Sequence, residues 1–413
     1  MQCLEYSKRR LAAFLEEIQR LKGAEFPYVH SENALQLIER TFSDYLAQLK
    51  KLKTAGSDPA TIRTACAAEL TGLFEYLPFL GFILRSTNPR NAFEVHGPLL
   101  RLAREIVKPN IKLIFSSEWD YSPLTYLGIT HLPDYVLIGL PAHESDNPLL
   151  LPLAGHELGH SIWATRDLSS KFGVLIDAKV IGDIKKRWTE YKALFPDVTS
   201  STILDTDFFA QQTWSPASDW GARQAEETFC DFAGLRIFGE SYLHAFAYLL
   251  APKQLWMRSV LYPNLVKRVD NLIKAATQYG LAVPAGYKDE FEDLLPPNSF
   301  DRQQTFLLSL ADAASSSVTD ALLLEVKGII DSSLKNPTSE SKVAEVLKDF
   351  QAVAPASDAG CLANMLNAGW QAFHDHELWM NISQIQSKEK TLKELILKSI
   401  EVFEYEQLLK VPL

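Results

Sequence analysis

The chain has 413 residues, of which 47% are apolar and 22% are charged, and its formal net charge is −10. This composition is ordinary for a soluble globular protein, and the length predicts two or three packed subdomains instead of one core. The acidic balance argues against a nucleic-acid-binding protein, which would usually present a basic face.

Cysteine usage and the start of the chain indicate the compartment. Residues 1–21 are typical of an amphipathic helix and lack the apolar segment of a signal peptide. No uninterrupted apolar run approaches the roughly 18 residues needed to cross a bilayer. We therefore expect a cytoplasmic protein with no membrane and no nucleic-acid partner. The four cysteines form no CxxC pair, which argues against a disulfide scaffold or a cysteine zinc site: Cys3, Cys66, Cys230 and Cys361.

The N-terminal quarter of the chain has helical periodicity. Apolar residues recur at three- and four-residue spacing over 1–22, 31–54 and 58–84, and glycine and proline residues interrupt the pattern between these runs. A further amphipathic run covers 98–107. Residues 1–108 are therefore predicted to form a helical N-terminal region.

After this region the pattern changes. Residues 111–115 and 135–140 are short, rich in β-branched or aromatic residues and bounded by Pro, Asn and Asp, which is typical of strands. The apolar run 149–164 predicts a largely buried helix. A basic amphipathic piece, 181–194, and a polar loop, 196–218, follow.

The rest of the chain is predicted to be helical. A second strongly helical block covers 223–250, and helices recur from Pro284 on, ending with a charged helix from about 387 to 409. The expected fold class is α+β, mostly helical, with a small sheet. The predicted regions are a helical N-terminal region (1–108), a core that contains the sheet (109–279) and a helical C-terminal region (280–413).

An HExxH motif, His156-Glu157-Leu-Gly-His160, lies inside the predicted helix 149–164. Positions i and i+4 share one helix face, so both imidazoles can reach a single metal ion. Glu157 lies about 100° around the helix from His156, where it can take a proton from a metal-bound water. Gly159 costs about 1 kcal/mol relative to alanine in a helix, which predicts the close approach of a crossing helix or a substrate. The alternative is a pair of hydrogen-bonded structural histidines.

A catalytic zinc site needs a third protein ligand and one open position. Glu227 and Asp231 are again i and i+4 in a predicted helix. We expect Glu227 to coordinate the ion and Asp231 to accept a hydrogen bond from the free nitrogen of a zinc-bound histidine. Glu226 is the rival ligand, but its partner at i+4 is Cys230, a poor acceptor.

HELGH followed by a second helix with ExxxD resembles the gluzincin branch of the zincin metallopeptidases, over roughly residues 130–275. The resemblance implies a small sheet over the two motif helices, a cleft lined by an edge strand, a bound Zn²⁺ ion and peptide-bond hydrolysis. Residues 109–279 would then be a zincin-like core. The spacing of 67 residues from His160 to Glu227 exceeds that of compact members. Either an insertion over 165–221 forms a lid or exosite, or the ligand is another glutamate.

The segment Tyr262-Pro263-Asn-Leu-Val-Lys-Arg268 is similar to a His-Pro…Arg segment that follows the glutamate helix in some gluzincins. There the histidine and arginine help to bind substrate or support the metal ligands. Tyr262 replaces the histidine, and a tyrosine hydroxyl can donate to a developing oxyanion. We therefore expect Tyr262 to be catalytic and Arg268 to bind substrate. The alternative is a proline-initiated helix with a surface arginine.

Three other histidines are weaker candidates. His374 and His376 are i and i+2, so they do not share a helix face. They either reach the cleft as an oxyanion donor or lie on the surface. His244 follows the glutamate motif in the chain and ranks below Tyr262 as such a donor.

The expected function is a zinc-dependent peptidase that cleaves a peptide or protein substrate through a zinc-bound water activated by Glu157. One alternative is a catalytically silent zincin-like scaffold, which would bind peptides or regulate a protein partner through the helical flanks. Another is a zinc hydrolase of a non-peptide amide. A silent scaffold would have no need of Glu157.

Overall fold

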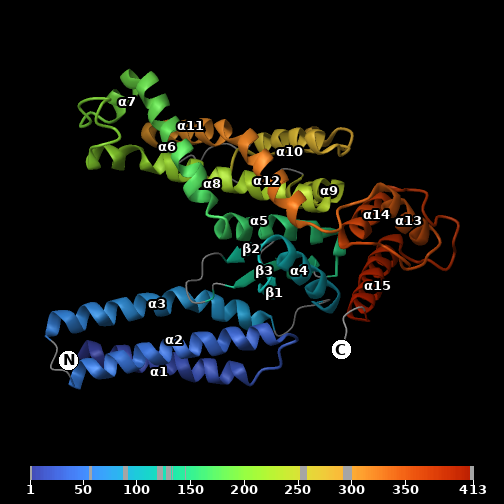
Figure 1. The fold of residues 1–413 in the computed structure, drawn as a ribbon, viewed down its shortest axis with the longest axis horizontal. Coiled ribbons are helices and arrows are strands. Elements are labelled where there is room, and N and C mark those ends of the chain that lie inside the picture. Colours follow the sequence, from blue (N-terminus) through green and yellow to red (C-terminus); the bar gives the residue numbers. More distant parts are fainter. Residues whose placement is uncertain are drawn as a thin grey trace. The chain divides into compact units, whose positions relative to one another are not determined.

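The structure is a computed structural model that describes residues 2–54, 58–86, 92–118, 124–126, 132, 134–144, 146–251, 258–291 and 300–409. The chain divides into two compact units. The first comprises Met1–Leu100 and Asn110–Asp146, and the second comprises Arg101–Pro109 and Asn147–Leu413. The protein is mostly helical with a small sheet (Figure 1), so the expected α+β class is confirmed.

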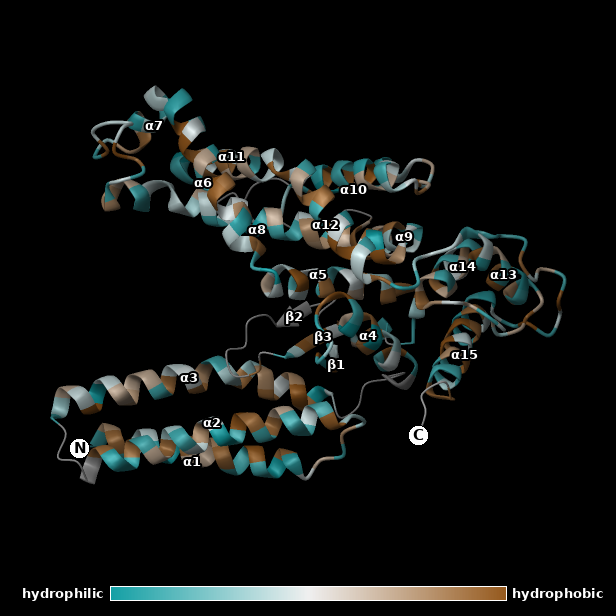
Figure 2. Cartoon of the chain, viewed as in Figure 1, coloured by the Kyte–Doolittle hydropathy of each residue, from teal (hydrophilic) through white to brown (hydrophobic). Residues whose placement is uncertain are grey.

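Three long helices form most of the first unit. They are α1 (Gln2–Lys22), α2 (Val29–Thr54) and α3 (Pro59–Arg85), and they lie side by side (Figure 1). Apolar and polar residues alternate along each of them (Figure 2), and the apolar ones, such as Leu11 and Phe42, are fully buried in a shared core. The helical periodicity predicted for this part of the chain is confirmed.

The sheet belongs to the same unit. Its strands are β1 (Lys112–Glu118), β2 (Leu124–Tyr126) and β3 (Tyr135–Pro141), and in the described part of the chain their order is β1-β3-β2. Strands β1 and β3 pair in parallel, and β2 pairs with β3 antiparallel. The two predicted strands are confirmed, whereas β2 is too short to give a periodic signal. Ile114 and Leu137 join the core of α1–α3.

This packing groups the chain differently from the three predicted regions. The strands share an apolar core with the N-terminal helices, and the C-terminal helices belong to the same unit as the HExxH motif. The boundary between the units also falls inside a helix, α4 (Ala92–Ile106), and not at its end. Helical periodicity reports which face of a segment is buried, not which other segment covers it.

Helix α3 is long and apolar enough to cross a membrane by length and composition, although it has no uninterrupted apolar run of that length. In its most apolar window 28% of the residues are buried. Helices α11 (Arg302–Ser317) and α12 (Thr319–Ser333) pass the same test only as a pair bent by 45°. The core helix of a soluble protein also passes it, so the expected cytoplasmic location stays a prediction.

The second unit is built around one long helix, α8 (Phe208–Phe238). Besides α11 and α12, its further helices are the 3₁₀ helix η2 (Pro148–Leu153), α5 (Ala154–Thr165), α6 (Leu168–Lys186), α7 (Trp188–Leu194), α9 (Glu240–Leu250), α10 (Leu265–Tyr279), the 3₁₀ helix η3 (Tyr287–Glu290), α13 (Glu340–Gln351), α14 (Leu362–His374) and α15 (Lys388–Leu409). Helices α5, α6, α10, α11 and α12 pack against α8 (Figure 1).

Two predicted helices are each divided. The run 149–164 begins as η2, which contains Pro152, and becomes α-helical only at Ala154. The run 223–250 is interrupted at Gly239, whose φ of +64° favours glycine, and the chain continues as α9. Helix α8 also starts fifteen residues earlier than expected, inside the predicted loop, because the side chain of Asp207 caps its first turn.

Candidate metal centre

Helices α5 and α8 cross at very short distance because small residues line the contact. A Cβ atom added at Gly159 would lie 2.7 Å from the Cα of Cys230, and one added at Gly155 would lie 2.9 Å from the Cα of Gly234. Both distances are shorter than real Cβ contacts, so neither glycine can be replaced without a shift of the backbone. The close approach predicted from Gly159 is therefore that of a crossing helix, and it brings the HExxH and ExxxD segments together.

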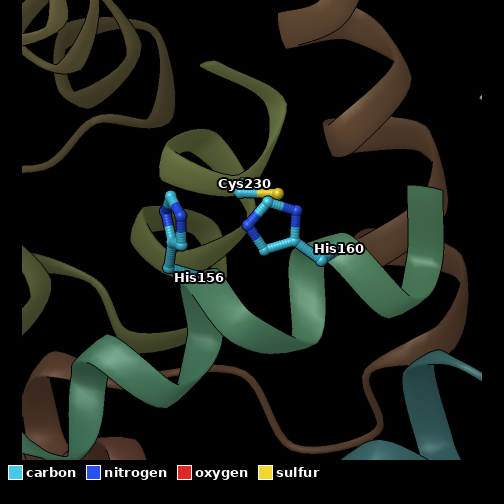
Figure 3. A group of neighbouring side chains, drawn as sticks. All are labelled: His156, His160 and Cys230. Carbon is cyan, nitrogen blue, oxygen red and sulfur yellow. The ribbon is translucent and has the colours of Figure 1, made fainter. Parts of the chain in front are cut away.

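The two motif imidazoles leave α5 on one face and point toward α8 (Figure 3), with ring centroids 5.1 Å apart. Both Nε2 atoms face the carboxylate of Glu227. Its Oε2 lies 3.2 Å from His156 Nε2, and its Oε1 lies 3.7 Å from His160 Nε2. Two helices that are distant in sequence thus deliver the three predicted metal ligands to one place.

The opposite edge of each imidazole is held by a second carboxylate. Nδ1 of His156 donates to Asp231 Oδ1 at 3.0 Å, as predicted, and Nδ1 of His160 donates to Glu226 Oε1 at 2.8 Å. A proton on Nδ1 leaves the lone pair on Nε2. In its neutral form, each ring therefore presents a lone pair toward Glu227, which is the arrangement that a metal ligand requires.

Asp231 is itself fixed by two buried groups. The hydroxyl of Tyr242 donates to its Oδ1 at 2.9 Å, and Nε and Nη2 of Arg268 donate to its two oxygens at 2.8 Å each. Burial by itself would raise the pKa of Asp231, but the charge of Arg268 and the hydrogen bonds from His156 and Arg268 hold it well below its usual range. These contacts therefore favour the ionised, carboxylate form of Asp231.

Arg268 lies against Asp231. Its side chain is 11% exposed, and two of its nitrogens donate to that carboxylate. These contacts fit a residue that supports the partner of His156, which is close to the other role that the resemblance offered, and the expected role in substrate binding stays a prediction.

Tyr262 lies over the same guanidinium. The Cζ of Arg268 is 5.2 Å from the centroid of the Tyr262 ring. Residue Tyr262 is 41% exposed, and the negative charge of Glu227, followed by burial, raises the pKa of its hydroxyl to about 12. Its phenol is thus a neutral hydrogen-bond donor beside the cluster, with part of its surface open to solvent.

Glu157 is buried, with 5% of its surface exposed. Burial raises the pKa of its carboxyl group, while the neighbouring His156 and His160 partly offset that rise. A carboxyl group with a raised pKa accepts a proton more readily than an ordinary one, which suits a general base.

Two features of the cluster fit a bound cation. Among the described residues, Glu227 Oε2 is buried yet has no hydrogen-bond partner, although His156 Nε2 lies 3.2 Å away. Burial lowers the pKa of His156, but its interactions with Asp231 and Glu227 outweigh burial and raise it to about 10. Arg268 already pairs with Asp231 and Arg223 with Glu226, so Glu227 is the carboxylate whose charge a proton on His156 or a metal ion can balance.

The thiol of Cys230 is another candidate for the third metal ligand. His156, His160 and Cys230 form a group whose ligand atoms lie within 4.8 Å of one another (Figure 3). Burial raises the pKa of the Cys230 thiol well above its usual value, whereas His156 and the other nearby cations lower the pKa of Glu227 despite burial. A metal ligand must be deprotonated, so Glu227 is the better third ligand.

Sequence reasoning missed two contributors: Glu226 as the partner of His160, and Tyr242 as a partner of Asp231. Glu226 was considered only as a rival ligand, because its contact with a histidine 66 residues away leaves no mark in local spacing. Tyr242 reaches Asp231 only because the chain reverses at Gly239, and its ring fills the space where Gly234 lacks a side chain.

A cavity of about 450 Å³ in the same unit lies apart from this cluster. It is lined by residues of α8, α10, α13 and α14, among them Arg236, Tyr279 and Leu347, and by none of the motif residues. It therefore does not define a substrate-binding cleft for the metal centre.

Comparison with known proteins gives no further assignment, since no protein family, curated protein or solved structure matches this chain.

Proposed function

We propose that this protein is a zinc-dependent metallohydrolase, most simply a cytoplasmic peptidase of the gluzincin type, with α5 and α8 as its two motif helices. The observation that carries the proposal is the convergence of two Nε2 atoms on a buried, unpartnered Glu227 oxygen, while both Nδ1 atoms are tied to carboxylates. His156, His160 and Glu227 would hold the ion, which matches the two-histidine, one-carboxylate ligand set of many catalytic zinc sites.

Bound zinc supplies a Lewis acid that polarises the scissile carbonyl and acidifies water. Glu157 accepts the proton of the attacking water and passes it to the leaving amine, which its buried position next to both histidines supports. Tyr262 donates its hydroxyl proton in a hydrogen bond to the developing oxyanion. Arg268 keeps Asp231 ionised, so that His156 retains the correct tautomer.

The test combines metal content with turnover. Purified full-length protein is expected to contain one zinc ion per chain by mass spectrometry and to hydrolyse unstructured casein. Glu157→Gln should keep the zinc and the fold and lose turnover by about 10²- to 10⁴-fold. Full activity in this variant would refute the assignment of the base.

The alternatives give different results in the same experiment. A silent scaffold would bind zinc but show no hydrolysis that depends on Glu157 with casein or with a panel of non-peptide amides. A non-peptide amidase would hydrolyse the panel and leave casein intact. If neither the purified protein nor protein reconstituted with zinc contains the ion, the peptidase, the zinc-binding scaffold and the non-peptide amidase are all excluded.

A further inference from the structure

Two histidines far from each other in sequence meet on the surface of the second unit. His244 lies in α9, and His374 is the last residue of α14. Nε2 of His374 is 3.1 Å from Nδ1 of His244, and the ring centroids are 4.7 Å apart. His374 is exposed and His244 is half-buried, so solvent and small ions can reach the pair.

Both rings rest on one indole. Trp370 lies one turn before His374, and its ring stacks on His244 at 5.2 Å with a 19° angle and on His374 at 5.6 Å with a 24° angle. Trp370 is buried, and its Nε1 donates to the carbonyl of Leu149 at 3.1 Å. The platform is therefore fixed, and it limits the rotation of both imidazoles.

The separation of the two nitrogens fits one metal ion. Imidazole nitrogens bind zinc at about 2.0–2.1 Å, so two of them at an angle between 90° and 110° are about 2.8–3.4 Å apart. The observed 3.1 Å falls within this range. Imidazole is a preferred ligand of Zn²⁺, Ni²⁺ and Cu²⁺.

We propose that His244 and His374 form a second metal site, separate from the HExxH cluster, which binds a divalent transition-metal ion with water in the remaining positions. On binding, the proton that one ring shares with the other moves to the outward nitrogen of its own ring. Both imidazoles stay neutral, and no proton is released by either ring.

The type of ligand sets the selectivity of the pair. Burial, followed by the neighbouring His374, lowers the pKa of His244 to about 4, so its lone pair is available at neutral pH. Mg²⁺ and Ca²⁺ prefer oxygen ligands, whereas imidazole nitrogen suits Zn²⁺, Ni²⁺ and Cu²⁺. The ammonium group of Lys388, which donates to the carbonyls of Phe373 and Asp375 close to His374, repels every cation, so binding depends on the metal–nitrogen bonds.

The site can be tested with Ni²⁺ on tag-free, full-length protein by isothermal titration calorimetry. Compared with the wild type, His374→Ala and His244→Ala should each lose one Ni²⁺ equivalent or weaken it by at least about tenfold, which is about 1.4 kcal/mol. His376→Ala is the matched control, because His376 is exposed two residues beyond the pair, and it should titrate like the wild type.

Wild-type binding curves in His374→Ala would overturn the proposal, as would an equal loss in His376→Ala. His374 is exposed at a helix end, so its removal should leave the melting temperature unchanged. His156→Ala would remove a different Ni²⁺ ion, the one bound at the HExxH cluster. Failure of this second site is therefore distinguishable from failure of the proposed zinc centre.

Discussion

Glu226 and Glu227 are neighbours in the chain and act on opposite edges of the same imidazole. Glu226 Oε1 accepts the Nδ1–H of His160 at 2.8 Å, while Glu227 Oε1 lies 3.7 Å from Nε2 of that ring. Successive helical residues point about 100° apart, so a ring inserted between the two side chains contacts both. Arg223, half-exposed on the same helix, donates to the second oxygen of Glu226 at 2.6 Å.

This relationship predicts different outcomes for the two glutamates. Glu227→Gln should abolish stoichiometric zinc binding, because it removes a ligand. Glu226→Ala should keep one zinc per chain but weaken it by about 10- to 100-fold, as expected when a partner of a ligating histidine is lost. Competition with a chelator measures both, with the exposed Glu190→Gln as control. Unchanged affinity in Glu226→Ala would show that the contact does not orient His160.

Arg268 should matter more for stability than a comparable arginine elsewhere in the same unit. Arg268→Ala leaves the buried Asp231 carboxylate without its main counter-charge, which should lower the free energy of unfolding by about 3–5 kcal/mol. Arg236→Ala removes a more exposed ion pair with Asp331 and should cost about 1 kcal/mol or less. Urea denaturation compares them. Equal losses would mean that the Arg268–Asp231 pair is not buried as described.

Two helical glycines, Gly159 in α5 and Gly173 in α6, should respond oppositely to replacement by alanine. Gly159→Ala forces a methyl group against the backbone of Cys230, so it should destabilise the protein by about 1–3 kcal/mol and weaken zinc binding. Gly173→Ala, inside α6, meets no atom within 4 Å and should stabilise by about 0.5–1 kcal/mol. Thermal unfolding of both variants checks the opposite signs. A stabilised Gly159→Ala protein would contradict the close crossing of α5 and α8.

Tyr262 can be separated from the residues that hold the metal. Tyr262→Phe keeps the ring on Arg268 and removes only the hydroxyl, so zinc content should stay at one per chain while kcat falls by about 10²- to 10³-fold. Tyr279→Phe, which alters a hydroxyl in the separate cavity, is the control and should leave kcat unchanged. A Tyr262→Phe enzyme with wild-type kcat would exclude the hydroxyl as an oxyanion donor.

The amino-acid sequence by itself determined the local features of this protein. The i, i+4 spacing of His156 and His160, and of Glu227 and Asp231, is fixed by the pitch of a single helix, and so is the periodicity of α1, α2 and α3. These predictions needed no knowledge of the partner segment, which is why they agree with the structure.

Only the tertiary structure decided which segments meet. The crossing of α5 and α8 placed Glu226 next to His160, the reversal at Gly239 brought Tyr242 to Asp231, and Arg268 came to donate to both oxygens of Asp231. Each of these contacts joins residues whose separation along the chain carries no periodic signal. Their geometry follows from how buried surfaces pack, and packing depends on the whole unit at once.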